Sequence, residues 1–381
     1  MEVHRTVTED GYVLELHRIP HGRHENEHMQ RTGIYYHEAP PAASGISRPV
    51  LFCMHGILDS SASWVMPGID HAWGLLMADA GFDVWMGNSR GNVYSRDHAT
   101  LNPKKREYWK FSFEEMAQFD VPANINYILK WTGRPSLAYS GHSQGTTQFF
   151  AAMTLYPELH EKVWAFCAFG PVAYMKHSNS TLLKMGCHMR SDSLQKLFGR
   201  GEYLSLLGFI PETVPALLSE MPYLGEPLLK IGMSSIIGYN KHSTDIRRMS
   251  IYMAHEPNGT SMQNIKHWAQ AVRSGRFCRM DRGKKENLKR GGTRRPKAYD
   301  TDVLKTLPFP LFMYVGGRDP LTSPRDFAHL RSHFCEDKIE VTVIPDYVHL
   351  CMIWGTTAAE KCYIPAHRQL LSAHAAHFGL N

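Results

Sequence analysis

Ser143, Asp319 and His349 are three residue types that together can break a carboxylic ester bond. A serine hydroxyl is a weak nucleophile until a histidine takes its proton, and a carboxylate holds that histidine in the right tautomer. Ser143 is the central residue of a Gly-x-Ser-x-Gly pattern, which is typical of a nucleophilic serine on a sharp turn. We therefore predict Ser143 as nucleophile, His349 as general base and Asp319 as the acid that orients the base.

The residues on either side of Ser143 predict a tight turn between a strand and a helix. Residues 135–140 are strand-like, and residues 146–156 are typical of a helix that Pro157 ends. Such a turn would hold the hydroxyl clear of the sheet, at the positive end of the helix. A turn without catalytic function can carry the same five-residue pattern, and the flanking strand and helix favour the catalytic interpretation.

Asp319 and His349 each follow a predicted strand. The two strand-like runs are residues 309–315 and 339–344, and carboxyl ends of parallel strands meet at one edge of a sheet. Asp346 is closer to His349 in sequence, but its place in the same loop gives poor geometry for supporting the ring. The other histidines after Asp319 do not lie in a loop after a strand: His329, His333, His367, His374 and His377.

Histidines near these motifs have simpler interpretations. His329 and His333 have a helical spacing that suits a metal ion, but no acidic third ligand lies nearby in the sequence, so we expect no metal site. His55 and His142 are interpreted as structural, since His142 cannot easily reach around to the neighbouring serine.

The loop at residues 55–61 is the candidate for one half of an oxyanion hole. It follows residues 49–54, a continuous apolar run typical of a parallel strand covered on both faces. In serine hydrolases such a loop supplies one backbone N–H, and the residue after the nucleophile supplies the other. We predict the N–H groups of Ile57 and Gln144 as the donors, with Leu58 as the next candidate for the first.

Strand-like and helix-like runs alternate in residues 1–174 and 301–381, which predicts an α/β core with a mainly parallel sheet. Residues 175–300 carry apolar helical patches broken by prolines and no strand-like run, so we expect an inserted helical cap or lid. The methionines and leucines of this segment suit an apolar substrate tunnel, although packing of the cap on the core accounts for most of them.

Three local predictions complete the fold. Asp10-Gly11 between strand-like runs predicts a hairpin, and residues 33–36 predict a further strand at the same antiparallel edge. Residues 113–129 predict a helix interrupted by Pro122. Arg90, in a glycine-punctuated loop, is expected to form a salt bridge.

The composition describes a globular protein, with 43% hydrophobic and 20% charged residues among 381. No apolar run reaches the about 18 residues that a membrane-spanning helix needs. The first residues are polar and show no signal-peptide core, which suggests either a cytosolic protein or a chain without its leader. Asn179 and Asn258 begin glycosylation sequons, which would matter in a secretory protein.

Residues 282–297 hold eight basic residues and one acid, so this stretch accounts for the net charge of +6. It is interpreted as a solvated surface loop, with a patch for anionic lipid as the alternative. Nucleic acid is disfavoured, because no aromatic residues are interleaved for base stacking. The seven cysteines form no Cys-x-x-Cys pair, and one or two disulfides remain open.

Several motifs together resemble the neutral and acid lipase family, which includes gastric and lysosomal acid lipases and many insect lipases. The matching segments are TEDGY (8–12), HGILDSS (55–61), DVWMGNSRGN (83–92), GHSQGTT (141–147), GPVAYM (170–175) and His349. The order of Ser143, Asp319 and His349 is also that of the α/β-hydrolases. By this resemblance those three residues match the family's triad, and the backbones of Ile57 and Gln144 match its oxyanion hole.

The resemblance implies hydrolysis of triacylglycerols or sterol esters by a secreted or lysosomal enzyme with a mobile cap. We interpret the chain as an ester hydrolase that acts through an acyl group on Ser143, a reaction that needs no metal or organic cofactor. We expect a monomer that meets neutral lipid at an oil–water or membrane interface. The sequence departs from the family at Cys351, where an acid usually follows the catalytic histidine by two residues. The alternatives are a short-chain carboxylesterase and a non-catalytic lipid-binding or storage protein with the same fold.

Overall fold

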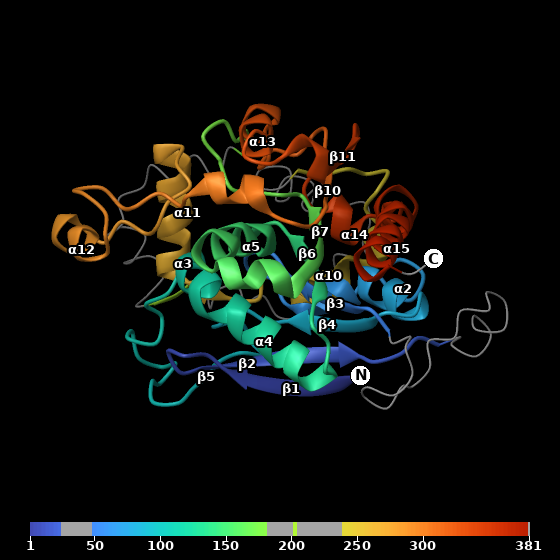
Figure 1. Cartoon of the computed structure of the whole chain (residues 1–381), viewed down its shortest axis with the longest axis horizontal. Coiled ribbons are helices and arrows are strands. Elements are labelled where there is room, and N and C mark those ends of the chain that lie inside the picture. The colour runs from blue at the N-terminus through green and yellow to red at the C-terminus, as the bar shows by residue number, and fades with distance from the viewer. Residues whose placement is uncertain (24–47, 181–200, 204–237, 380–381) are drawn as a thin grey trace.

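The computed structural model describes residues 1–23, 48–180, 201–203 and 238–379. At its centre is a nine-stranded sheet in the order β1-β2-β4-β3-β6-β7-β10-β11, with β5 paired to β2 (Figure 1). The strands are β1 (Glu2–Val7), β2 (Tyr12–Ile19), β3 (Val50–Met54), β4 (Asp83–Gly87), β5 (Asp97–His98), β6 (Leu137–His142), β7 (Val163–Phe169), β10 (Leu311–Gly316) and β11 (Ile339–Ile344). Neighbouring strands from β4 to β11 run parallel, which confirms the predicted α/β class.

Helices cover both faces of this sheet (Figure 1). They include α2 (Trp73–Asp79), α4 (Val121–Thr132), α5 (Gln144–Leu155), α13 (Pro324–Arg331), α14 (Cys351–Trp354) and α15 (Ile364–Phe378). Phe52 and Met54 of β3 pack in one buried cluster with α4 and α5, whereas Leu51 and Cys53 pack in a second cluster with α2 and α15. Successive side chains of a strand point to opposite faces, so burial of both faces explains the continuous apolar run.

The antiparallel edge is the predicted hairpin. β1 pairs with β2 from Glu2↔Arg18 to Val7↔Val13, and β2 then pairs antiparallel with β4. Gly11 turns the chain with a φ of 95°, a conformation that costs glycine little. The strand predicted at residues 33–36 lies outside the described residues.

The predicted helix before β6 is divided. α3 (Phe113–Glu115) begins with a capping box between Ser112 and Glu115, a π-helical segment (Met116–Asp120) follows, and α4 comes next. Pro122 lies in the first turn of α4, where a missing N–H is tolerated. The irregularity therefore precedes Pro122, whereas the sequence placed the break at this proline.

The described part of the predicted cap contains α10 (Met249–His255), α11 (Met262–Ser274) and α12 (Lys284–Lys289). The expectation that this segment has no strand was wrong, because β8 (Glu202–Tyr203) and β9 (Thr260–Ser261) form a short antiparallel pair. Trp268, Ala271 and Val272 of α11 join the same buried cluster as α4 and α5. The boundaries at residues 174 and 300 stay predictions.

The described cysteines are unpaired thiols, so the one or two disulfides left open by the sequence are not formed among them. These residues are Cys53, Cys167, Cys278, Cys335, Cys351 and Cys362. Burial raises the pKa of the Cys167 thiol, which lies in β7. Cys187 lies outside the described residues.

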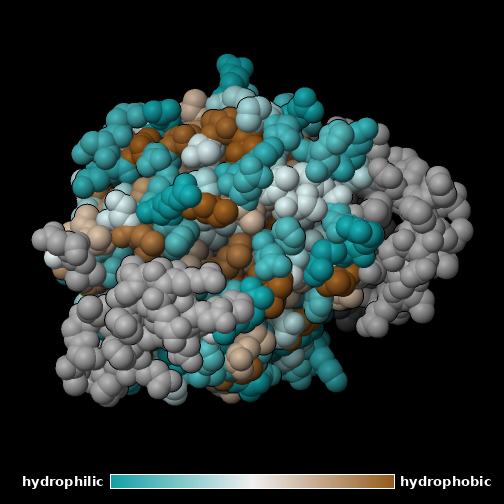
Figure 2. All heavy atoms as spheres, turned by 90° about the vertical axis from the view of Figure 1, so that its right-hand side faces the viewer, coloured by the Kyte–Doolittle hydropathy of each residue, from teal (hydrophilic) through white to brown (hydrophobic). Residues whose placement is uncertain are grey.

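The described surface is mixed in character. On the face shown in Figure 2, apolar groups are separated by hydrophilic ones. Within the described ranges, no helix combines the length and the apolar character that crossing a bilayer requires.

Arg90 is buried and joins three parts of the fold. Its Nη1 and Nη2 donate to Asp10 of the hairpin at 2.6 and 2.9 Å, and its Nε donates to Asp120 before α4 at 2.7 Å. The guanidinium also lies 4.0 Å from the centroid of the Tyr12 ring, a cation–π distance. The salt bridge predicted for Arg90 is confirmed.

Arg90→Met should lower the free energy of unfolding by about 3–5 kcal/mol, because it leaves Asp10 and Asp120 without their buried counter-charge. Arg5→Met is the matched control: the Arg5 side chain is 61% exposed beside Glu15. Arg5→Met should lower the free energy of unfolding by less than about 1 kcal/mol. Urea unfolding measures both variants, and equal losses would contradict a special role for the buried cluster.

Candidate active site

Ser143, His349 and Asp319 lie in one hydrogen-bonded row. The His349 Nε2 atom is 2.8 Å from the Ser143 Oγ atom, and His349 Nδ1 is 2.7 Å from Asp319 Oδ2. All three are buried, with relative exposures of 7% for Ser143, 2% for His349 and 5% for Asp319. The structure therefore brings together the three residues that the sequence proposed as a catalytic set.

Parallel strands deliver these side chains to one edge of the sheet. Ser143 follows β6, Asp319 lies in the loop after β10, and His349 lies in the loop after β11. The last two loops are joined by backbone bonds, from Gly317 N–H to Ile344 O at 2.8 Å and from Arg318 N–H to Tyr347 O at 2.9 Å. Asp319 and His349 are consequently held in register with each other.

Ser143 has a strained backbone, with φ of 50° and ψ of −119° at the start of α5. Such a conformation typically costs about 1–3 kcal/mol and persists where the surroundings enforce it. A Cβ atom on Gly145 would lie 2.2 Å from Met54 O, so glycine is needed for α5 to approach β3 this closely. The predicted tight turn between β6 and α5 is present, and it presents the Ser143 hydroxyl to His349.

The Asp319 carboxylate is fully engaged. Its Oδ1 accepts from the N–H groups of Leu321 and Thr322 at 2.8 and 3.1 Å, and its Oδ2 faces His349. Burial raises the pKa of this carboxyl, but the charge of His349 and these hydrogen bonds outweigh burial, so the pKa lies below its usual value. An ionised Asp319 accepts a hydrogen bond from His349 Nδ1–H, which keeps that proton on Nδ1 and leaves the Nε2 lone pair for the Ser143 hydroxyl.

Asp346, the other carboxylate considered as a partner for His349, faces away from that ring. Asp346 pairs with Lys361 at 3.2 Å. Cys351 is the position at which the sequence departs from the family. Its sulfur accepts a hydrogen bond from the Val348 N–H in the loop that carries His349, with 3.4 Å between sulfur and nitrogen.

The 55–61 loop passes directly beside Ser143. A Cβ atom on Gly56 would lie 3.3 Å from Ser143 Cβ, and Leu58 has a positive φ of 61°. His55 has its Nδ1 2.7 Å from Gly56 O, and its Nε2 accepts from Ser89 N–H at 3.0 Å, which confirms its structural interpretation. The placement suits Ile57 as an oxyanion donor, and that role stays a prediction.

Gln144 is the first residue of α5. The first N–H groups of a helix have no partner within the helix, so this N–H is available to a bound oxyanion. The donor role of Gln144 also stays a prediction. Its side-chain oxygen accepts bonds from Asn264 and Trp268 of α11, two residues that the sequence analysis did not single out.

His142 lies against the site without joining the row. Its Nε2 is 3.5 Å from His349 O, and the two rings are 5.1 Å apart. Burial, reinforced by the charge of His349, lowers the pKa of His142 to about 3. His142 therefore stays neutral beside His349, in agreement with a structural role.

The remaining predicted site residues are placed as follows. His329 and His333 pack around Tyr174, and no group of three metal-ligating side chains occurs among the described residues. Asn179 is exposed. Asn258 is 4% exposed and its amide nitrogen donates to His255 O at 3.3 Å, which makes it a poor glycan acceptor. Glycosylation of Asn179 stays a prediction.

Two family models match the chain: a partial α/β-hydrolase lipase region over residues 1–68, and an α/β-hydrolase fold over residues 49–356. Human lipase member M is 36% identical over 95% of this chain and 80% of its own length. Bovine gastric triacylglycerol lipase is 35% identical over 95% and 86%. Human lysosomal acid lipase/cholesteryl ester hydrolase is 36% identical over 93% and 84%.

Solved structures support the fold independently. A soluble variant of monoglyceride lipase from Saccharomyces cerevisiae covers 98% of this chain and 94% of its own, with a TM-score of 0.57 and 12% identity. A thermophilic esterase from Thermogutta terrifontis covers 98% and 100%, with a TM-score of 0.52 and 16% identity. At this identity the likeness concerns the fold alone.

Asp319→Asn should slow labelling of the protein by a fluorophosphonate by on the order of 10⁴-fold, because the amide stabilises the wrong histidine tautomer. Asp346→Asn is the matched control, three residues from His349, and should label near the wild-type rate. The rates are measured by quenched labelling of proteins with equal thermal unfolding midpoints. Equal slowing by both changes would refute the assignment of Asp319.

Proposed function

Since the chain belongs to the α/β-hydrolase family of gastric and lysosomal acid lipases, we propose that it is a serine lipase that hydrolyses the ester bonds of neutral lipids. The observation that carries the proposal is the buried row of Ser143, His349 and Asp319, with bonds of 2.8 and 2.7 Å, in a chain about a third identical to such lipases. Hydrolysis by this row needs protein groups and water alone.

The first half of the reaction acylates Ser143. His349 Nε2 takes the hydroxyl proton as Ser143 Oγ attacks the ester carbonyl carbon. The carbonyl oxygen becomes negative and is held by the N–H groups of Ile57 and Gln144, each worth roughly 3 kcal/mol of barrier. The imidazolium, stabilised by Asp319, then gives its proton to the departing alcohol as the C–O bond breaks.

The second half releases the acid. A water molecule takes the place of the alcohol, His349 accepts one of its protons, and the resulting hydroxide attacks the acyl carbon. The tetrahedral intermediate collapses as the bond between the acyl carbon and Ser143 Oγ breaks. The Ser143 Oγ takes the proton from His349, and the free fatty acid departs. Both halves use the same base and the same oxyanion donors.

The substrates proposed are triacylglycerols or sterol esters, the two classes in the names of the bovine gastric and human lysosomal relatives. We also propose a secreted or lysosomal site of action, and the name of the human relative, a lysosomal acid lipase, supports the second. We expect a monomer that works at an oil–water or membrane interface.

Wild-type protein should hydrolyse para-nitrophenyl esters with a preference for long acyl chains, because the proposed substrates carry long chains. Ser143→Ala should abolish this turnover at every chain length. Initial rates from acetate to palmitate, at pH 5 and pH 7.5, measure the preference. A preference for acetate or butyrate would favour a carboxylesterase, and folded protein without turnover would favour a lipid-binding protein.

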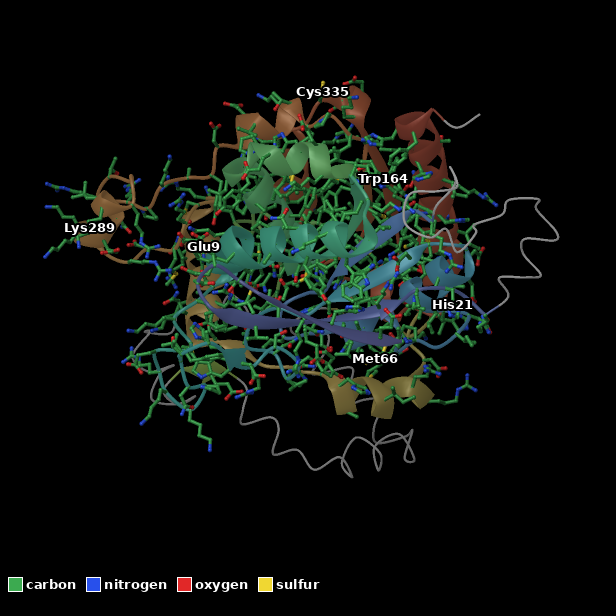
Figure 3. All side chains as sticks on the ribbon, turned by 60° about the horizontal axis from the view of Figure 1, so that its bottom comes forward. Glu9, His21, Met66, Trp164, Lys289 and Cys335 are labelled. Atoms are coloured by element: carbon green, nitrogen blue, oxygen red, sulfur yellow. The ribbon has the colours of Figure 1, made fainter. Side chains whose placement is uncertain are left out.

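The basic stretch supports an interfacial substrate. It contains α12, which projects from the body of the molecule in Figure 1, with Lys289 at the far edge in Figure 3. Arg282 pairs with Glu115 at the base, whereas Lys284 and Lys285 are exposed. Leu288 is 52% exposed among these lysines. Cations around an exposed apolar side chain suit an anionic lipid surface.

Changing Lys284, Lys285 and Lys289 together to Gln should weaken binding to vesicles that contain phosphatidylserine by on the order of 100-fold, at about 1 kcal/mol per lysine. All proteins carry Ser143→Ala, so binding is measured without hydrolysis. The control changes exposed Lys104, Lys105 and Lys130 to Gln, with the same change in charge. Vesicle sedimentation measures the binding of both triple variants. Equal weakening of binding in the two would reject a specific lipid-binding surface on α12.

A further inference from the structure

The side chain of Gln144 is held from a distant part of the chain. Its Oε1 accepts from Trp268 Nε1 at 2.7 Å and from Asn264 Nδ2 at 2.8 Å, both on α11. All three side chains are buried, with Asn264 fully so. Two donors therefore satisfy one oxygen, away from water, on the residue that follows the nucleophile.

α11 is itself fixed where it makes these bonds. Asn264 Oδ1 accepts from Phe113 N–H at 2.9 Å, and Asn264 Nδ2 also lies 3.1 Å from Thr260 Oγ1. The Trp268 ring lies 5.0 Å from the ring of Phe113. A side chain held by packing and by further hydrogen bonds can hold another without large entropic cost. Neither donor is free to follow a displaced Gln144.

The other end of the Gln144 amide is also in contact. Its Nε2 lies 3.5 Å from the sulfur of Met116 in the π-helical segment. The amide is thus placed between α11 and this segment. Because the side chain and the backbone N–H belong to one residue, holding the amide restrains the direction of the N–H group.

We propose that Asn264 and Trp268 are positioning residues that keep the Gln144 N–H aimed at the oxyanion of the proposed reaction. The inference rests on the proposed function, since it concerns the same intermediate. Donors in an oxyanion hole act through preorganised geometry, and small misplacement costs rate without much effect on ground-state binding. The alternative is that these bonds contribute to folding alone.

Trp268→Phe keeps an aromatic ring and removes the indole donor. We expect kcat per titrated active site to fall by roughly tenfold to a hundredfold, less than complete loss of one oxyanion donor, with KM nearly unchanged. Trp109→Phe is the matched control, because the Trp109 indole donates to Pro103 O at 2.8 Å and has no bond to the catalytic row. It should leave kcat unchanged. Counting active sites with a fluorophosphonate removes unfolded protein from the rate.

A double-mutant cycle tests whether Trp268 acts through Gln144. Gln144→Met has similar volume and lacks the amide oxygen that accepts these bonds, so it should lower kcat by itself, and adding Trp268→Phe should cause little further loss. Additive losses, or a Trp268→Phe protein with lower thermal stability and full kcat, would overturn the proposal. Wild-type protein without esterase activity would instead reject the proposed function, so the two failures are distinguishable.

Discussion

The strained turn at Ser143 is the constraint on which the site depends. A non-glycine residue at φ of 50° is unfavourable, and it persists because β6 and α5 are both fixed by packing. Gly145 permits the close approach, since its backbone lies against Met54 O at a distance that admits no side chain. Relaxing the turn would move the hydroxyl away from His349 and, at the same time, the Gln144 N–H away from the position proposed for the oxyanion.

The rest of the fold holds two other loops against that turn. Asp319 and His349 come from adjacent parallel strands whose loops share backbone hydrogen bonds, and both side chains are buried. Water is therefore largely excluded from their hydrogen bond, which strengthens it. The central strands of the sheet are buried on both faces, so hydrophobic burial on each side stabilises the position of the sheet.

Sequence reasoning succeeded where the signal was local. The apolar run of β3, the Asp10-Gly11 hairpin and the strand–turn–helix around Ser143 follow from periodicity and turn chemistry. His349 was separable from other histidines because it follows a strand. The Gln144 contacts with Asn264 and Trp268 were missed because they join segments far apart in the sequence, and no local pattern marks a buried hydrogen bond. The β8–β9 pair was missed because two-residue strands carry no detectable alternation.

The central claim is that ester hydrolysis passes through an acyl group on Ser143. Its most direct test is mass spectrometry of peptides from protein quenched in acid during turnover of para-nitrophenyl palmitate. The account predicts one palmitoyl group on the peptide that contains Ser143, and none after Ser143→Ala. Sustained turnover with no acylated peptide, or with the acyl group on another residue, would contradict it.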